Sequence, residues 1–407
     1  MIRWITDRIG TSPWADEFVS GDIRIVDVRD LRDGSGNAPS LIKEKVDMAL
    51  CHLKHGERVV ICCDYGISRS NAVAAAVLAK LDNRKLNETL LQVIDATGEE
   101  RIKIDFVNNL RLALNESQGN GTGNRILVIG ADSFVGRAIC QTFDSESTVC
   151  RPGEERSRIF SPVILDAAVQ DEEIGWLLFC WHPVGIDTNE ALGELLTGLR
   201  NALEVCRIRR VRLVFISGHQ VFAGLHPKEP EIFGEERAPL PSGAAGDGFF
   251  LAETLINLYQ TRHGLPVLII RPSFLYGAED DRRNFFNTFV RKAILGEEIV
   301  THHFKDGPAR VDLLHIKDFA NAVRMAVNQR IEGVLHVASG ALITTRELAE
   351  RLVACIGSES TVRQIEMPGL NNLAQLDARR ARTGLGWEPY ISLEEGILDV
   401  YSCKITP

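Results

Sequence analysis

Short apolar runs alternate with segments of helical spacing through the first part of the chain. Ile23–Val28 and Val59–Cys62 have the length and composition of buried strands, and the second is bounded by Gly56. Apolar residues recur at helical intervals in four further segments. These helices are predicted over residues 40–53, 70–81, 87–96 and 104–114. Strands that alternate with helices in so short a stretch predict a small α/β domain.

A second series of buried strands follows a polar, glycine-rich segment at 116–124, which has nothing to bury. The apolar runs of this series are separated by stretches of helical length, which predicts a doubly wound, Rossmann-like parallel sheet. From about Phe274 the strands shorten, which predicts a smaller C-terminal subdomain of the substrate-binding type. The runs lie at 125–129, 176–180, 213–216 and 267–270. We therefore expect domains at 1–117 and 124–407, joined by a linker at 118–123.

Composition and charge narrow the class of protein. The hydrophobic and charged fractions, 45% and 25%, are typical of globular chains, and no apolar run approaches the length of a membrane span. A net charge of -9 argues against nucleic acid or an anionic membrane as a general partner. Nine cysteines without CxxC spacing favour free thiols in a reducing cytoplasm. We expect a cytoplasmic, multidomain protein.

Candidate chemistry first appears where the second strand ends. Cys63 is followed by a short loop, Asp64-Tyr65-Gly66-Ile67-Ser68, and then by Arg69 and Ser70 at the start of an alanine-rich helix. Such a loop points backbone N–H groups inward, and a helix N-terminus adds positive potential, so the segment suits a phosphate dianion. The same field lowers the pKa of the Cys63 thiol, whose thiolate is the nucleophile. Arg69 is expected to hold two phosphate oxygens with its planar fork.

This segment resembles the HCxxGxxR(S/T) signature of the dual-specificity and tyrosine phosphatase superfamily, over roughly residues 1–115. The resemblance implies a cysteine-dependent phosphatase that needs no cofactor, with a phosphorylated protein or small molecule as substrate. Ser70 would assist release of the thiol, and an aspartate would protonate the leaving group. Asp33, in a glycine-rich loop, is the preferred acid and Asp30 its competitor. Cys62 replaces the usual histidine, and is read as a buried strand residue rather than a redox partner of Cys63.

The second part of the chain contains a strand–turn–helix glycine pattern, Gly130-Ala-Asp-Ser133-Phe134-Val135-Gly136. It resembles the GxxGxxG of extended short-chain dehydrogenases/reductases, especially nucleotide-sugar epimerases and reductases, with Ser133 in place of the middle glycine. Segments at 211–217, 270–277, 310–318 and 385–389 also resemble that family. The resemblance implies an NAD(P) site and a homodimer formed through this part. Arg151 would face a 2′-phosphate or be a solvated surface residue. Where that family has small residues near the adenine, this chain has Cys180-Trp181-His182-Pro183, whose bulky side chains would block the nucleotide.

The catalytic residues of that family are missing from the sequence. Alignment on Glu253 places Ala245 at the tyrosine and Phe249 at the lysine of YxxxK, and Gly218 at the serine or threonine. The chain has no tyrosine between Tyr65 and Tyr259, so a small shift of the alignment does not bring a tyrosine to the catalytic position. We therefore interpret this part as a non-catalytic module that regulates or targets the phosphatase.

Two other functions remain open at this point. One is a nucleotide-sugar oxidoreductase or epimerase that uses unusual residues near Glu253 or His219, with the N-terminal domain as an accessory. The other is a scaffold in which both parts are inactive. The histidines show no ligand spacing with carboxylates or cysteines, so no metal site is predicted.

Overall fold

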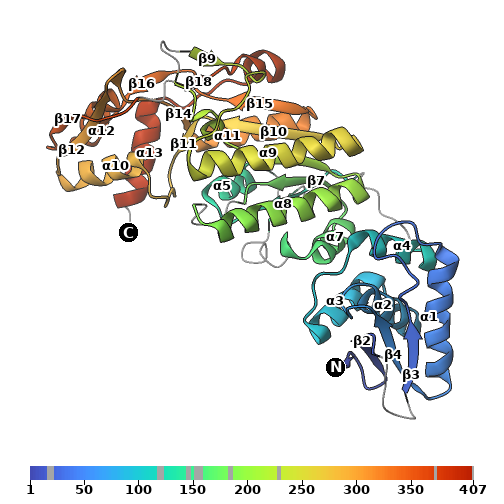
Figure 1. Ribbon diagram of the computed structural model, residues 1–407. Helices are drawn as coiled ribbons and strands as arrows, with labels where there is room; N and C mark the ends of the chain where they lie inside the picture. The colour runs from blue at the N-terminus through green and yellow to red at the C-terminus, as the bar shows by residue number, and fades with distance from the viewer. Residues whose placement is uncertain are drawn as a thin grey trace. The chain divides into compact units, whose positions relative to one another are not determined.

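The computed structural model describes residues 1–15, 23–116, 123–143, 148–150, 159–181, 187–226, 231–370 and 374–405. The chain forms two compact units. Unit 1 consists of Met1–Arg125, Glu154–Leu177 and Thr197–Arg212, and unit 2 of the remaining segments. The ribbon in Figure 1 shows the order of the elements along the chain.

Unit 1 contains a four-stranded sheet of order β1-β2-β4-β3, in which β4 pairs in parallel with both β2 and β3. The strands are β1 (Arg3–Trp4), β2 (Ile9–Pro13), β3 (Ile23–Asp27) and β4 (Arg58–Cys63). The helices are α1 (Pro39–Lys54), α2 (Arg69–Asp82), α3 (Leu86–Thr97) and α4 (Ile104–Leu114). The sequence pattern located each of these elements except β1 and β2, because the β2 segment Ile-Gly-Thr-Ser-Pro has no run of apolar residues.

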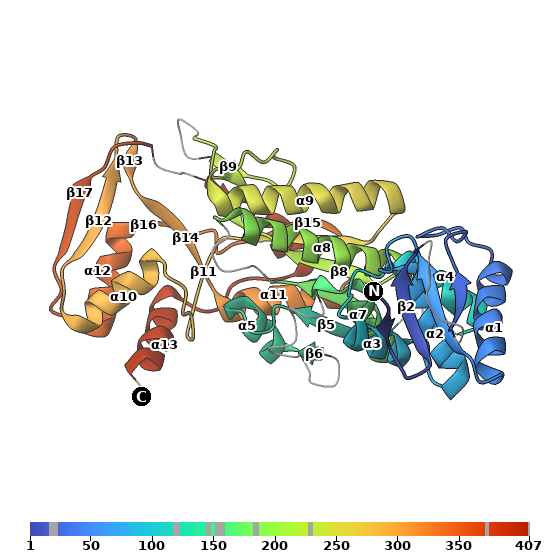
Figure 2. The same cartoon turned by 60° about the horizontal axis from the view of Figure 1, so that its bottom comes forward.

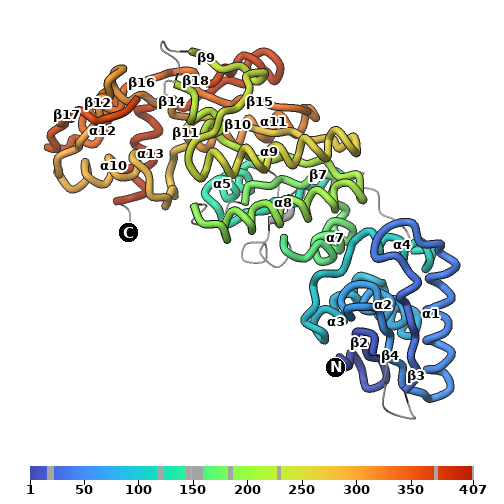
Figure 3. Tube along the Cα trace, viewed as in Figure 1, coloured from blue at the N-terminus to red at the C-terminus, as the bar shows by residue number. Residues whose placement is uncertain are grey.

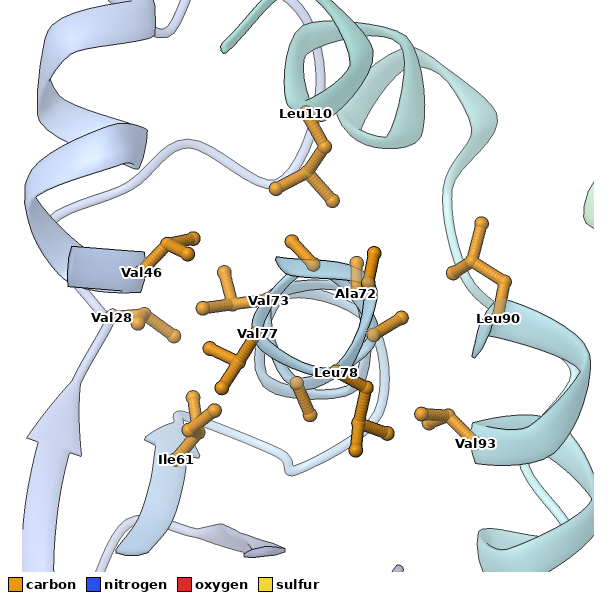
Figure 4. Close-up of a cluster of buried hydrophobic side chains, with 14 of the residues drawn as sticks. Val28, Val46, Ile61, Ala72, Val73, Val77, Leu78, Leu90, Val93 and Leu110 are labelled. Carbon is orange, nitrogen blue, oxygen red and sulfur yellow. The ribbon is translucent and has the colours of Figure 1, made fainter. Parts of the chain in front are cut away.

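Helix α2 is the centre of unit 1. Its alanine-rich first eleven residues, from Arg69 to Ala79, are all buried, because α1, α3 and α4 pack around the helix (Figure 3). Small alanine side chains let these neighbours approach closely, and valine and leucine fill the space between them. Figure 4 shows this core around α2. The labelled side chains are Val28, Val46, Ile61, Ala72, Val73, Val77, Leu78, Leu90, Val93 and Leu110.

The second part of the chain contains the predicted parallel sheet, with order β15-β10-β8-β7-β5-β6. The pairings of β10 with β8 and β15, and of β5 with β6, are parallel. This confirms an α/β, Rossmann-like fold for this part. The strands are β5 (Arg125–Ile129), β6 (Thr148–Cys150), β7 (Ile174–Phe179), β8 (Arg212–Ile216), β10 (Val267–Pro272) and β15 (Gly333–Val337). The helices of this part of the chain are α5 (Phe134–Thr142), α7 (Pro162–Asp171), α8 (Asn189–Arg209), α9 (Gly243–His263) and α11 (Ile316–Asn328). Helix α7 and the end of α8 belong to unit 1.

Shorter elements of unit 2, which Figure 2 shows side by side, form a separate hydrophobic core. Its buried members include Phe286 and Leu352. The helices α10 (Phe285–Leu295), α12 (Thr345–Ile356) and α13 (Leu393–Ile405) contribute to it. The strands of this region are β11 (Phe274–Tyr276), β12 (Ile299–Phe304), β13 (Gly307–Pro308), β14 (Arg310–His315), β16 (Leu342–Thr344) and β17 (Val362–Glu366). A further pair joins β9 (Glu231–Phe233) to β18 (Ala374–Leu376), and short helical turns span His219–Phe222 and Arg380–Gly384.

Two observations bear on the expected class of protein. Within the described ranges, no helix combines the length and apolar character needed to cross a membrane. Cys140 is disulfide-bonded, which differs from the expectation that all cysteines are free thiols.

Candidate functional site

The glycine turn between β5 and α5 has the geometry of a dinucleotide-binding turn. Gly130 has φ +93°, and a Cβ atom there would lie 2.6 Å from the backbone nitrogen of Trp181. A Cβ atom on Gly136 would lie 1.9 Å from the carbonyl oxygen of Gly130. Both positions therefore require glycine, the first for its conformation and the second for close packing of the helix against the turn.

Ser133 replaces the middle glycine without blocking the turn. Its hydroxyl donates to the carbonyl oxygen of Gly130 at 2.7 Å and accepts from the amide of Gly136 at 2.9 Å, so Ser133 caps α5. The amides of Phe134 and Val135 lie in the first helical turn, which has no intrahelical acceptors for them. Together with the helix dipole, these amides suit a pyrophosphate. The residues present thus fit NAD(P); Arg151, His182 and Pro183 lie outside the described residues.

Arg282 is a residue beside this turn that sequence reasoning missed. Its guanidinium lies 4.5 Å from the ring centre of Phe134, the first residue of α5. Asp280 holds it through contacts of 2.7 and 3.0 Å. In the sequence, Arg282 is marked only as part of a charged stretch, Glu279-Asp-Asp-Arg-Arg. The position of this stretch near α5 depends on the fold.

The positions of the family's proton relay are apolar in the structure. Ala245 lies in the first turn of α9, and Phe249, one turn later, is 9% exposed. A Cβ atom on Gly218 would lie 3.0 Å from Cε2 of Phe249. The phenol, ammonium and hydroxyl that such a relay uses are therefore replaced by a methyl group, a phenyl ring and no side chain.

Glu253, which the sequence placed near this site, is enclosed in a buried ion pair. Its carboxylate accepts from Ser217 Oγ at 2.6 Å, and from Arg271 Nε and Nη2 at 3.0 and 2.6 Å. All three side chains are buried. His336 extends the cluster, with Nε2 3.4 Å from Arg271 Nη1, and burial followed by the Arg271 charge lowers the pKa of His336 to about 3. These groups hold β8, α9, β10 and β15 together and are not free for proton transfer.

His219 is the titratable side chain next to the vacant serine position. Burial lowers its pKa to about 4, although a hydrogen bond with the Pro272 backbone opposes the shift. The ring is therefore neutral at pH 7. The other motif residues are structural: Asp312 accepts from the amides of Ser339 and Gly340, and Asp318 accepts from those of Tyr390 and Ile391.

In unit 1, the loop after β4 closes around the Cys63 thiol. The amide of Gly66 donates to Cys63 Sγ at 3.2 Å, and Ser70 Oγ lies 3.2 Å from the same sulfur. Burial raises the pKa of Cys63, but hydrogen bonds from Ser70 and from the amides of Ile67 and Gly66 lower it overall. Gly66 has φ +65°, and a Cβ atom there would lie 2.5 Å from the nitrogen of Pro13. The neighbouring Cys62 is fully buried, and burial raises its pKa to about 12.

The other residues assigned to this loop are occupied by contacts within the protein. Arg69 pairs with the carboxylate of Asp64 and donates to the carbonyl oxygens of Arg29 and Leu31 at 3.0 and 2.9 Å. Asp33 forms an ion pair with Lys103, whose Nζ atom lies 3.2 Å away. Ser68 is buried, whereas Tyr65 is 75% exposed. Of the described residues, no three or more His, Cys, Asp or Glu side chains form a group that could hold a metal ion.

Comparisons with known proteins concern the C-terminal region. Residues 183–338 match the NAD dependent epimerase/dehydratase family. A dTDP-glucose 4,6-dehydratase of Streptomyces niveus is 26% identical over 197 residues, which are 47% of this chain and 57% of the relative. UDP-glucuronic acid decarboxylase 5 of Arabidopsis thaliana is 24% identical over 227 residues, 54% of this chain and 64% of the relative. The chain thus spans less than two thirds of these relatives' length.

Solved structures show the same fold. RMD from Pseudomonas aeruginosa, complexed with NADPH, has a TM-score of 0.61 and 20% identity, and the match covers 69% of this chain and 98% of RMD. UDP-glucose 4-epimerase of Thermus thermophilus, in complex with NAD, has a TM-score of 0.59 and 20% identity, over 70% of this chain and all of the epimerase. At these identities the likeness concerns the fold.

The prediction of a cysteine-dependent phosphatase is wrong. The relatives and structural neighbours include sugar-nucleotide dehydratases, decarboxylases and epimerases, and none of these findings shows a phosphatase domain in residues 1–117. In the structure, Arg69 pairs with Asp64, so a phosphoryl group would first have to displace this carboxylate. What the findings establish is that the C-terminal region matches the NAD-dependent epimerase/dehydratase family and has its Rossmann-like fold.

Proposed function

We propose that the protein binds NAD(P) and a nucleotide-sugar in its C-terminal region and acts as an oxidoreductase of the epimerase/dehydratase type. The observation that carries this proposal is the turn at Gly130 and Gly136. Both glycines are sterically required, and the helix that follows offers its first-turn amides to a pyrophosphate. The family match and the names of the relatives support a nucleotide-sugar as the second ligand.

Bound NAD(P) would supply a hydride acceptor or donor, while the chain itself must move the proton of the sugar hydroxyl. Glu253 is excluded because Arg271 and Ser217 enclose its carboxylate. His219 is neutral at pH 7 and adjoins Gly218, so we assign it the proton-transfer role. A base of such low pKa is weak, so turnover is expected to be slow compared with a tyrosine–lysine relay.

A second function is favoured by Phe249. Its ring lies at the lysine position and approaches Gly218, so the site lacks the groups of the usual relay, and this function is to bind the two ligands without reaction. Quenching of tryptophan fluorescence by NADH and NADPH tests binding, because the backbone of Trp181 adjoins Gly130. Turnover of UDP- and dTDP-sugars in wild type and His219→Ala then separates the two functions. Loss of turnover in the variant supports the oxidoreductase, whereas binding without turnover in wild type supports the binding module. A lack of dinucleotide binding would contradict both.

We further propose that the Cys63–Arg69 loop of unit 1 holds an oxyanion, such as the phosphoryl group of a ligand, without hydrolysing it. The support is the inward amide of Gly66, the thiol with its lowered pKa, and the guanidinium of Arg69. Asp64 acts as a competing internal carboxylate. Binding of inorganic sulfate to wild type, lost in Arg69→Gln, is the expected result. Equal binding by both proteins would exclude the loop as the site.

A further inference from the structure

Helix α7 shares the core of the N-terminal α/β fold, and the end of α8 joins it through ion pairs. Val163 of α7 belongs to the same buried cluster as Phe106 and Leu110 of α4, and Ile164 packs against that cluster. Helix α7 is in contact with both α3 and α4 (Figure 1). These contacts all lie within unit 1.

A buried carboxylate, Asp166, lies at the centre of this contact. Arg111 of α4 approaches from one side, with its Nη1 atom 2.7 Å from Asp166 Oδ2. Arg209 of α8 donates from Nε and Nη2 to the two carboxylate oxygens, at 2.6 and 2.9 Å. The side chains of Asp166 and Arg111 are fully buried and that of Arg209 is 1% exposed. One carboxylate therefore pairs with a cation from each of two helices, at positions about 100 residues apart in the sequence.

Polar side chains surround the triad. Arg111 also donates to the Asn87 side chain of α3, and Arg209 donates to Gln170 at 3.1 Å. A second pair, Arg207 with Asp105, joins α8 to α4 at 2.8 Å but is partly exposed. Water screens the exposed pair, whereas removal of the buried carboxylate would leave two guanidinium groups without a counter-charge. Loss of the Asp166 carboxylate is therefore expected to destabilise the fold much more than loss of the Arg207–Asp105 pair.

Helix α4 also holds the Cys63–Arg69 loop. The Ser68 hydroxyl accepts from the amide of Lys103, the residue that precedes α4, at 3.1 Å. Further along the helix, Asn109 donates to the carbonyl oxygen of Gly34 at 2.9 Å, in the loop whose carbonyl groups hold Arg69. One helix thus contacts both the loop and, through Arg111, the α7–α8 pair.

We propose that Asp166 makes α7 and the end of α8 part of one cooperative unit with the N-terminal fold, so that an oxyanion in the Cys63–Arg69 loop also protects α8 against local opening. The first half of this inference stands on the buried triad alone. The second half rests on the oxyanion binding proposed above, with α4 as the shared element.

Hydrogen exchange of the full chain tests both halves. Without ligand, Asp166→Asn is expected to speed exchange of amides in α4 and in residues 197–209 by roughly tenfold or more. In wild type, local opening must break the buried ion pairs of Asp166, and the variant lacks this cost. The matched control is Asp105→Asn, which removes the exposed pair of the same interface and is expected to change these rates less than about twofold. Faster exchange confined to α7 would overturn the cooperative unit. If Asp166→Asn does not fold, Arg209→Lys keeps the buried charge and is expected to show the same pattern in weaker form.

Addition of inorganic sulfate tests the coupling. In wild type we expect slower exchange in the loop, in α4 and in residues 197–209, whereas in Asp166→Asn the protection ends at α4. Protection of the loop alone in wild type would overturn the coupling. If sulfate protects no segment, the oxyanion proposal fails, and with it the coupling, while the ligand-free comparison still decides whether the unit is cooperative.

Discussion

The ring of Phe249 lies so close to Gly218 that a Cβ atom on the glycine would be 3.0 Å from Phe249 Cε2. In the aligned family these two positions hold the lysine and the serine or threonine of the proton relay. Here one position has gained a large apolar side chain and the other has lost its side chain. The larger side chain at 249 lies next to the space left by the missing side chain at 218. The site has therefore lost its polar groups and is also packed differently.

This relationship predicts non-additive effects on stability. Gly218 has an extended backbone, so alanine is strained there only by its neighbours, Gln220 Oε1 at 2.1 Å and Phe249 Cε2 at 3.0 Å from the added Cβ atom. We expect Gly218→Ala to cost about 1–3 kcal/mol of unfolding free energy. In a Phe249→Leu background the cost should be smaller, with a coupling of about 1 kcal/mol. Urea unfolding of wild type, the two single variants and the double variant measures this double-mutant cycle. Strictly additive changes in unfolding free energy would show that the ring does not limit residue 218.

His336 predicts a specific loss of stability in acid. Its pKa is lowered to about 3 in the fold, from an ordinary value near 6.5. In this pH range the unfolded chain binds a proton at His336 that the folded chain does not bind. The unfolding free energy therefore falls as the pH decreases from about 6.5 towards 3. The full effect is on the order of several kcal/mol, because the ring is buried beside Arg271. His336→Gln should flatten this part of the stability profile; an unchanged slope between pH 6.5 and 4 would contradict the assignment.

The two adjacent cysteines should titrate far apart. Hydrogen bonds lower the pKa of Cys63 despite its burial, whereas burial raises that of Cys62 to about 12. The ultraviolet absorbance of the thiolate, taken as the difference between wild type and Cys63→Ser, should give a midpoint below that of an ordinary cysteine. Ser70→Ala removes one stabilising hydroxyl and should raise that midpoint. An unshifted midpoint in Ser70→Ala would argue against this hydrogen bond.

Asp64 should weaken any oxyanion bound in the loop. Its carboxylate pairs with Arg69, so a ligand must displace it. Asp64→Asn is expected to tighten sulfate binding by about tenfold, the effect of about 1.4 kcal/mol of relieved competition. The control is Asp47→Asn, which removes a partly exposed pair with Lys80 and should leave the affinity unchanged. Weaker binding by Asp64→Asn, measured by calorimetry, would contradict the competition.

Hydrophobic periodicity determined most of the secondary structure of this protein. The buried strands at β4, β5 and β8 and the helices α1 to α4 were located because an element that buries one face repeats its apolar residues at that element's own period. The two required glycines and the missing relay residues were also readable, because they are identities at fixed spacings. Strand β2 was missed, since its burial depends on neighbours rather than on its own residues.

Only the tertiary structure decided what the remaining polar residues do. Asp64 pairs with Arg69, Glu253 pairs with Arg271, and Asp166 pairs with an arginine on each side. These pairs form because the fold brings together groups that are distant or differently oriented along the chain. Whether a charged side chain binds a ligand or neutralises a neighbour depends on distances of a few ångströms between elements, and one sequence does not encode those distances locally. The residues of the Cys63–Arg69 loop alone resembled a phosphatase, and neither their contacts nor the relatives of the chain supported that function.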